Sequence, residues 1–227
     1  MELVFLESLR LSEEPYTTSD VIAEFAGNEH HSVTRLIRNY KNDLEEFGVL
    51  TFEIHKPLKG SEGGRPRKIY HLNEEQATLL ITYLDNTERV RAFKKELVRQ
   101  FFSMKHEQMA REVLRDIGKP IRRTMTDAIK EAGFSHHFYK HFTNLCYKSA
   151  IGYNASQLKK ARNIPRNASP LDYLTTEEQN AVNKREQEIT TLVSLGMDYE
   201  QIKAVLANKG VIYQTTLKMP QSELLQA

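Results

Sequence analysis

The sequence predicts a mainly helical α+β protein with two domains, a winged helix-turn-helix followed by an all-helical domain. Three observations lead to this prediction. Residues 17–47 contain a short amphipathic helix, a polar turn and a longer basic helix. Residues 50–72 contain two strand patterns separated by a glycine-rich basic loop. From residue 120 onward, apolar residues recur at helical spacing, which indicates helices only.

The first helix is expected to begin at Thr17-Thr18-Ser19-Asp20, where a hydroxyl and a carboxylate three residues later can accept hydrogen bonds from free amides. Gly27 can adopt the left-handed conformation that ends a helix, and Asn28-Glu29-His30 should form the turn. A short strand at residues 3–6 is expected to join the later hairpin. The apolar side of the first helix is formed by Val21, Ile22 and Phe25.

The second predicted helix is longer and has an apolar and a basic side. Its apolar side is formed by Val33, Leu36, Ile37, Tyr40, Leu44 and Phe47. A recognition helix needs this division, because one side packs on the core while the other offers donors to bases and phosphates. A solvated face without any DNA role is the alternative interpretation. The candidates for DNA contact are His30, His31, Ser32, Thr34, Arg35, Arg38 and Lys41.

Residues 50–55 alternate between apolar and polar types, as expected of a half-buried strand, and Ile69-Tyr70-His71-Leu72 can pair beside them. A basic loop that projects beside a recognition helix suits phosphate contact, because its cations displace condensed counterions. A nucleotide-binding phosphate loop is excluded, since Gly63-Gly64 are followed by Arg65-Pro66 and then by a strand. The candidates for DNA contact in this hairpin are Lys56, Lys59, Arg65, Arg67 and Lys68.

Two further helices complete the first domain. Asn73 can cap a helix whose apolar residues are Ala77, Leu80, Ile81 and Leu84. A long helix should then run from Glu88 to about Asp116 and end at Gly118-Lys119-Pro120. Its role stays open between a core helix and a spacer or dimerisation arm. The apolar edge of this helix is formed by Val90, Phe93, Leu97, Phe101 and Met104.

The second half is predicted to be helical throughout. Capping residues are expected at Ser135, Asn154, Thr175 with Glu178, and Asp198, and helix ends at Gly133 and Gly196. The first of these helices contains Ile121, Met125 and Ile129, and the last spans Tyr199 to Ala207. The predicted organisation is a DNA-binding domain at 1–115, a linker at 116–120, a helical assembly or partner domain at 121–210 and a tail at 211–227.

Several segments together resemble the phage regulatory proteins of the Rha family. They are Tyr16 to Phe25, His30 to Arg38 and Lys68 to Leu80, and the resemblance covers roughly residues 1 to 105. It implies a phage or prophage transcription regulator in the bacterial cytoplasm that reads double-stranded DNA with the helix and wing described above. Residues 126–206 are similar to the C-terminal helical domain of some phage antirepressor-like proteins.

Composition agrees with this setting. A net charge of +2 is too mild to mark a nucleic-acid binder, so local basic clusters carry the prediction. The single Cys146 excludes an internal disulfide and fits a reducing compartment. No signal peptide or long apolar run is visible, so a cytoplasmic protein without membrane contact is expected. A homo-oligomer, most simply a dimer, is expected because one recognition helix reads few base pairs. The favoured dimer surface is the helix with Val182, Ile189, Leu192 and Val193.

No enzyme, cofactor or metal site is predicted. His137 and His141 have a spacing that zinc could use, but third and fourth ligands are missing from the pattern. Residues 132–171 contain no Asp or Glu, which could reflect a second nucleic-acid contact, a docking surface for an acidic protein, or a face neutralised by downstream acids. The rival function is an antirepressor-like protein that binds another phage or host regulator instead of DNA. The basic residues of this segment are Lys140, Lys148, Lys159, Lys160, Arg162 and Arg166.

Overall fold

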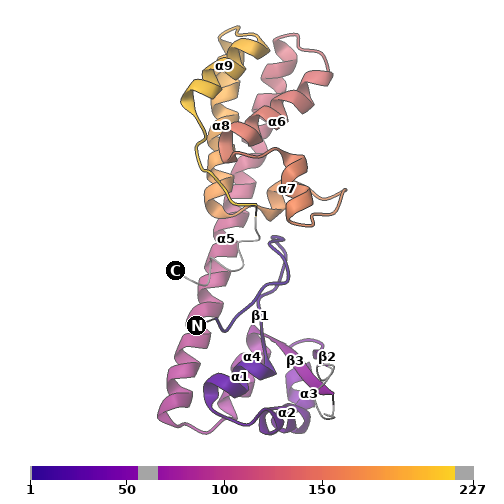
Figure 1. The fold of residues 1–227 in the computed structure, drawn as a ribbon, viewed down its shortest axis with the longest axis vertical. Coiled ribbons are helices and arrows are strands. Elements are labelled where there is room, and N and C mark those ends of the chain that lie inside the picture. The colour runs from indigo at the N-terminus through magenta and orange to yellow at the C-terminus, as the bar shows by residue number, and fades with distance from the viewer. Residues whose placement is uncertain (1, 56–65, 218–227) are drawn as a thin grey trace, which may run out of the picture. The chain divides into compact units, whose positions relative to one another are not determined.

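A computed structural model describes residues 2–55 and 66–217 of the chain, which is mainly helical with one small sheet (Figure 1). The chain divides into two compact units. Within the described residues, unit 1 comprises 2–7, 13–55 and 66–106, and unit 2 comprises 8–12 and 107–217. Helix α5 (Glu88–Glu131) contributes residues to both units. In the part of the chain that the structure describes, no helix combines the length and apolar content needed to cross a membrane.

Unit 1 contains an antiparallel sheet with strand order β1-β3-β2, made of β1 (Tyr16–Thr18), β2 (Thr51–His55) and β3 (Arg67–Asn73). The predicted pairing of the two hairpin strands is present, with Phe52 opposite Tyr70. Strand β2 is exposed along its whole length rather than half buried, because it is the edge strand and is not covered by a helix. The strand predicted at residues 3–6 is not formed, and Phe5 makes only an isolated bridge to Tyr16.

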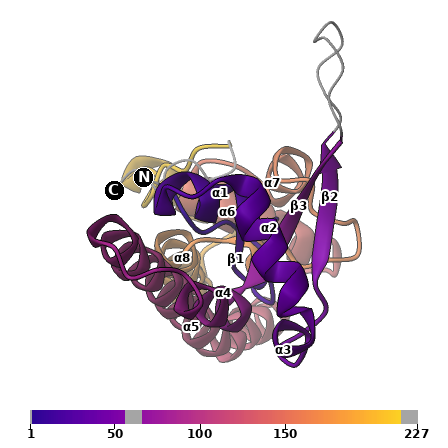
Figure 2. The ribbon, with the colours of Figure 1, turned by 90° about the horizontal axis from the view of Figure 1, so that it is seen from below.

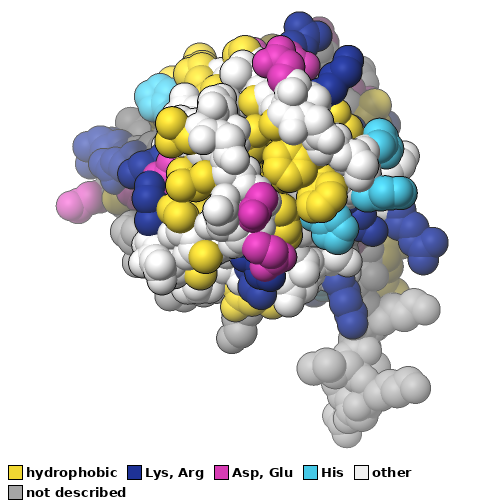
Figure 3. All heavy atoms as spheres, turned by 90° about the horizontal axis from the view of Figure 1, so that it is seen from above, with side chains coloured by type: hydrophobic (Ala, Val, Ile, Leu, Met, Phe, Trp, Pro, Cys, Tyr) yellow, Lys and Arg dark blue, Asp and Glu magenta, His cyan; other side chains and the backbone are white. Residues whose placement is uncertain are grey.

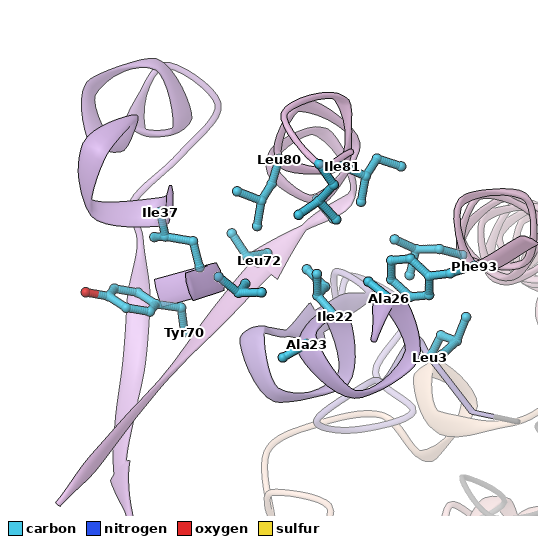
Figure 4. Close-up of a cluster of buried hydrophobic side chains, with 14 of the residues drawn as sticks. Leu3, Ile22, Ala23, Ala26, Ile37, Tyr70, Leu72, Leu80, Ile81 and Phe93 are labelled. Carbon is cyan, nitrogen blue, oxygen red and sulfur yellow. The ribbon is translucent and has the colours of Figure 1, made fainter. Parts of the chain in front are cut away.

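The helices of unit 1 are α1 (Ser19–Ala26), α2 (His30–Asn39), α3 (Lys41–Glu45), α4 (Glu74–Thr82) and the first part of α5. They enclose one apolar core, part of which Figure 4 shows. Its members come from every layer of the unit, so burial of α1 and α2 depends on β3, α4 and α5. The labelled core residues include Leu3, Ile22, Ala26, Ile37, Leu72, Leu80, Ile81 and Phe93.

Most helix ends of unit 1 lie where the capping residues in the sequence predicted them. Gly27 ends α1 with a φ of 73°, and Asn73 caps α4 with a hydrogen bond from the Gln76 amide. Helix α1 is capped by Thr18, the last residue of β1, rather than by Thr17, because it is the Thr18 hydroxyl that accepts a hydrogen bond from the Val21 amide. The long second helix of the prediction is divided into α2 and α3 at Tyr40, whose ring stacks on Tyr83 with centroids 4.2 Å apart.

Helix α5 continues past the Gly118-Lys119-Pro120 sequence at which it was expected to end, so that prediction is wrong. The predicted linker at 116–120 lies inside the helix. A proline removes one backbone hydrogen bond, but Met125 and Ile129 beyond it are buried in the core of unit 2. Gly118 serves close packing instead of termination, since a Cβ atom there would lie 2.6 Å from Asn183 Oδ1.

Unit 2 is helical and contains the second part of α5, α6 (His137–Ile151), α7 (Ala155–Ala161), a 3₁₀ turn (Pro170–Tyr173), α8 (Thr176–Ser194) and α9 (Tyr199–Lys209). The predicted caps at Asn154, Thr175 and Asp198 are confirmed, whereas α6 begins after His136 and not at Ser135. The apolar stripe of α8 that was predicted as a surface for self-association lies mostly in the core of unit 2. The apolar stripe predicted on α5 likewise lies mostly in the core of unit 1. The buried residues of these stripes are Val90, Phe93, Leu97, Phe101, Val182, Ile189 and Val193.

A buried ion pair holds the centre of unit 2. The side chains of Arg162 and Glu178 are 0% and 1% exposed, with Nη2 and Oε1 2.5 Å apart and Nη1 and Oε2 2.8 Å apart. Burial alone would raise the pKa of Glu178, but Arg162, the Thr215 hydroxyl and the Thr175 amide together hold that pKa below its ordinary value. Arg162 is therefore a core residue and not part of the basic surface that the sequence suggested.

We expect Arg162→Ala to destabilise unit 2 by about 3–5 kcal/mol, because removing one partner leaves the Glu178 carboxylate buried without its counter-charge. Urea unfolding of the full chain, followed by far-UV circular dichroism, measures this change. Lys203→Ala breaks the exposed pair with Glu200 and should leave the unfolding midpoint almost unchanged. Equal small effects of the two substitutions would contradict the role given to the buried pair.

Candidate nucleic-acid interface

Helix α2 presents its polar side chains away from the core of unit 1. Val33 and Ile37 are buried, whereas His31, Arg35 and Arg38 on the other side are exposed. Figure 2 shows α2 beside the paired strands β2 and β3. A three-residue turn, Gly27 to Glu29, separates α1 from α2. The exposed side of α2 is thus available for contact with a ligand along its length.

The basic side chains of this face differ in their internal contacts. Arg38 donates from Nε to the carbonyl oxygen of Thr34, 3.2 Å away, and the Thr34 hydroxyl donates to the His31 carbonyl at 3.1 Å. Lys41 Nζ lies 3.4 Å from Glu45 Oε1. Arg35 has no hydrogen-bond or ion-pair partner among residues 2–55 and 66–217. Its guanidinium can therefore bind a phosphate or a base edge without breaking a contact with those residues.

A polar cluster joins the beginning of α1 to the beginning of α2 and to β3. The buried Ser19 hydroxyl accepts a hydrogen bond from the Tyr70 amide at 3.0 Å and lies 3.2 Å from His30 Nε2. Asp20 Oδ1 lies 2.5 Å from Arg67 Nη2 and 3.1 Å from His30 Nε2. Sequence reasoning did not assign Ser19 and Asp20 to the site, because their partners lie far along the chain.

The electrostatics of this cluster favour a neutral His30. Partial burial lowers the pKa of His30 below its ordinary value, and the positive charge of Arg67 acts in the same direction, while Asp20 opposes them. The ring is only 19% exposed. His30 was predicted to contact DNA, and the structure places its ring against Asp20 and Ser19, where it fixes the start of α2.

The basic side chains in the described part of the predicted wing also contact other residues of unit 1. Lys68 Nζ lies 3.3 Å from the centroid of the Phe52 ring and 5.0 Å from that of Tyr70. Arg67, its neighbour on β3, is held by Asp20. Cation–π contacts of this kind fix the ammonium group but leave it partly solvated. The predicted contact residues Lys56, Lys59 and Arg65 lie outside the described residues.

Another side of unit 1 is acidic. A hollow of about 630 Å³ lies against β1 and the connection between α3 and β2, and its wall includes Tyr16 and Phe47. A phosphate backbone would be repelled here, so within the described part of unit 1 the side of α2 and β3 suits DNA better. The charged residues that line the hollow are all glutamates, namely Glu7, Glu13, Glu14, Glu46 and Glu75.

Unit 2 presents fewer free basic side chains to a nucleic acid than its sequence suggested. Arg162 is buried, and Lys159 donates to the carbonyl of Arg166 at 2.8 Å. Figure 3 looks onto one end of unit 2, where hydrophobic side chains lie beside histidines. The His141 ring contacts the rings of Phe138 and Tyr199. No group of three or more potential metal ligands occurs in the residues that the structure describes. The remaining exposed lysines of this segment are Lys140, Lys148 and Lys160.

Comparison with known proteins finds a family match within unit 1. Residues 17–106 match the family model described as phage regulatory protein Rha, which confirms the resemblance predicted from the sequence. No curated protein and no solved structure matches the chain. The similarity of residues 126–206 to antirepressor-like proteins stays a prediction. The match ends at the residue where unit 1 ends in α5, so the similarity to the phage regulatory protein Rha family lies within unit 1.

Proposed function

We propose that this protein is a phage transcription regulator that binds duplex DNA through a winged helix-turn-helix in unit 1. The observation that carries the proposal is the order of elements. The helix pair α1 and α2, joined by a short turn, is followed by the short helix α3 and then by the antiparallel strands β2 and β3, and β1 completes the sheet beside β3. Two helices joined by a turn of three or four residues, often containing glycine, are the core of a helix-turn-helix. The family of residues 17–106 supports a regulatory role.

In this proposal, α2 is the recognition helix. Its buried side rests on the core of unit 1, and its exposed side carries Arg35 and Arg38 one turn apart. Arginine can donate two parallel hydrogen bonds to the major-groove edge of guanine, and one turn of helix spans neighbouring base pairs. His31 and Thr34 share this side and can contact phosphate or base edges. The second helix of a helix-turn-helix enters the major groove in this way.

Strand β3 carries Arg67 and Lys68 to the base of the wing, where they would contact phosphates. Such contacts add affinity that is independent of sequence. Asp20 holds Arg67 and His30 at the same time, so it sets the position of the wing base relative to α2. It also lowers the positive charge offered to DNA. Asp20 therefore holds the wing base in a defined position relative to α2, although it weakens the electrostatic attraction of this face to DNA.

The double substitution Arg35→Ala/Arg38→Ala should weaken DNA binding by the full chain. The expected loss is about 1–3 kcal/mol for each specific base contact, or a salt slope smaller by about one for each phosphate contact. Fluorescence anisotropy with fragments of the phage regulatory region, titrated at several salt concentrations, measures both. Arg123→Ala, at an exposed arginine of α5 in unit 2, is the matched control and should bind as the wild type does. Unchanged affinity and slope in the folded double variant would remove α2 from the interface.

Asp20→Asn should have the opposite effect on random DNA. The substitution releases Arg67 and removes a negative charge beside the interface, so binding to random duplex should tighten and the salt slope should steepen by about one. Discrimination between operator and random DNA should fall, because the wing base and α2 lose their common partner. Asp127→Asn, at an exposed aspartate of unit 2, controls for the loss of one charge. Weaker binding to random DNA by Asp20→Asn would show that Asp20 acts in another way.

A further inference from the structure

Strand β2 is an open edge of the sheet in unit 1 (Figure 2). Among the described residues it pairs only with β3, so the backbone amides and carbonyls on its other side have no strand partner there. Edge strands of natural proteins are usually protected by proline, lysine, a bulge or a covering element. The strand Thr51–His55 contains neither proline nor lysine, and every residue of it is exposed. Such an edge is suited to pairing with a strand of another chain.

The open edge also carries large apolar side chains. Phe52 and Ile54 are 45% and 61% exposed, and they lie on the same face of the sheet because residues two apart in a strand point to the same side. Lys68 covers part of the Phe52 ring, with Nζ 3.3 Å from the ring centroid. A strand added to this edge would therefore gain apolar contacts as well as backbone hydrogen bonds.

We propose that two copies of this chain associate by pairing their β2 strands, antiparallel to each other, about a two-fold axis at Phe52. The two sheets then join into one continuous sheet. In this register Phe52 faces Phe52 of the second copy, and Ile54 lies diagonally across from the same ring, within the reach of an aromatic side chain. On the opposite face, Thr51 faces Glu53 of the second copy, and Glu53 faces its Thr51.

The charge of Glu53 decides this register. A pairing centred on Glu53 would set two carboxylates directly opposite each other, which is unfavourable. A pairing centred on Phe52 sets each carboxylate opposite the hydroxyl of Thr51, which can donate a hydrogen bond to it. Within each copy, Glu53 Oε2 can keep its contact with His55 Nε2 at 3.0 Å, and its other oxygen lies 3.8 Å from His71 Nε2.

A second copy suits this edge because a two-fold pairing covers the edges of both chains at once, and association then ends at the dimer. Two short strands bury little area, so we expect a weak dimer with a micromolar dissociation constant. The proposal does not rest on DNA binding, since β2 would join two copies in the absence of DNA. It replaces the stripes of α5 and α8 that the sequence had suggested for self-association, because the two units bury them.

Sedimentation velocity of the full chain, from micromolar to high micromolar concentration, tests the association. The wild type should form a dimer, and Thr51→Glu should raise its dissociation constant by about tenfold, because the new carboxylates face Glu53 on both sides of the axis. Thr51→Glu/Glu53→Lys should restore the dimer, since unlike charges then face each other. Thr124→Glu, at an exposed threonine of α5 in unit 2, is the matched control and should associate as the wild type does.

Circular dichroism should show that all of these variants are folded. The restoring substitution separates a contact between copies from damage to β2 itself, because a damaged strand would not be repaired by a second change. A wild type that stays monomeric over the whole concentration range would overturn the proposal. So would a double variant that is as weak as Thr51→Glu alone.

Disulfide cross-linking tests the orientation of the strands. Phe52→Cys should cross-link to itself on gentle oxidation, because the two cysteines lie opposite each other at the axis. His55→Cys should cross-link poorly, since antiparallel pairing about Phe52 separates the two copies of this residue along the strands. Cys146 is buried and should contribute little background. Cross-linking of His55→Cys that is as efficient as that of Phe52→Cys would show parallel strands and contradict the proposed interface.

Discussion

The start of helix α1 is the constraint on which the candidate interface depends. Ser19 is buried and accepts the Tyr70 amide, while Asp20 reaches both Arg67 on β3 and His30 on α2. One pair of adjacent residues thus ties three elements together at their polar ends, and the apolar core ties them together at the other side. Because Ser19 cannot move without losing hydrogen bonds in a buried place, the spacing between α2 and β3 is fixed before any ligand binds.

Several basic residues of unit 1 have an internal partner, so the positive charge of the side formed by α2 and β3 is moderate, as is the net charge of +2 of the whole chain. Arg67 is balanced by Asp20, Lys41 by Glu45, and Lys68 lies over aromatic rings. Such partners reduce indiscriminate attraction to phosphates and hold the cations in defined positions. Binding would then depend more on geometry than on total charge.

The parts of the fold that sequence reasoning predicted well are those set by neighbouring residues. Asn73, Asn154 and Asp198 cap helices by contacts three residues away, so the pattern itself contains the cause. Pro120 and Arg162 were misjudged because packing decides them: buried residues beyond Pro120 continue the helix, and Glu178 draws Arg162 into the core. Similarly, the exposed arginines of α2 could be predicted from periodicity, but the link through Asp20 depends on a distant strand.

Hydrogen exchange on the full chain, with and without a short DNA duplex from the phage regulatory region, tests the central claim most directly, because it needs no substitution and maps the contact along the sequence. If α2 and the wing base bind DNA, protection should increase in residues 30–41 and 66–73 and should weaken as salt is raised. Saturating binding that leaves these residues unchanged and protects only unit 2 would contradict a DNA-binding role for unit 1.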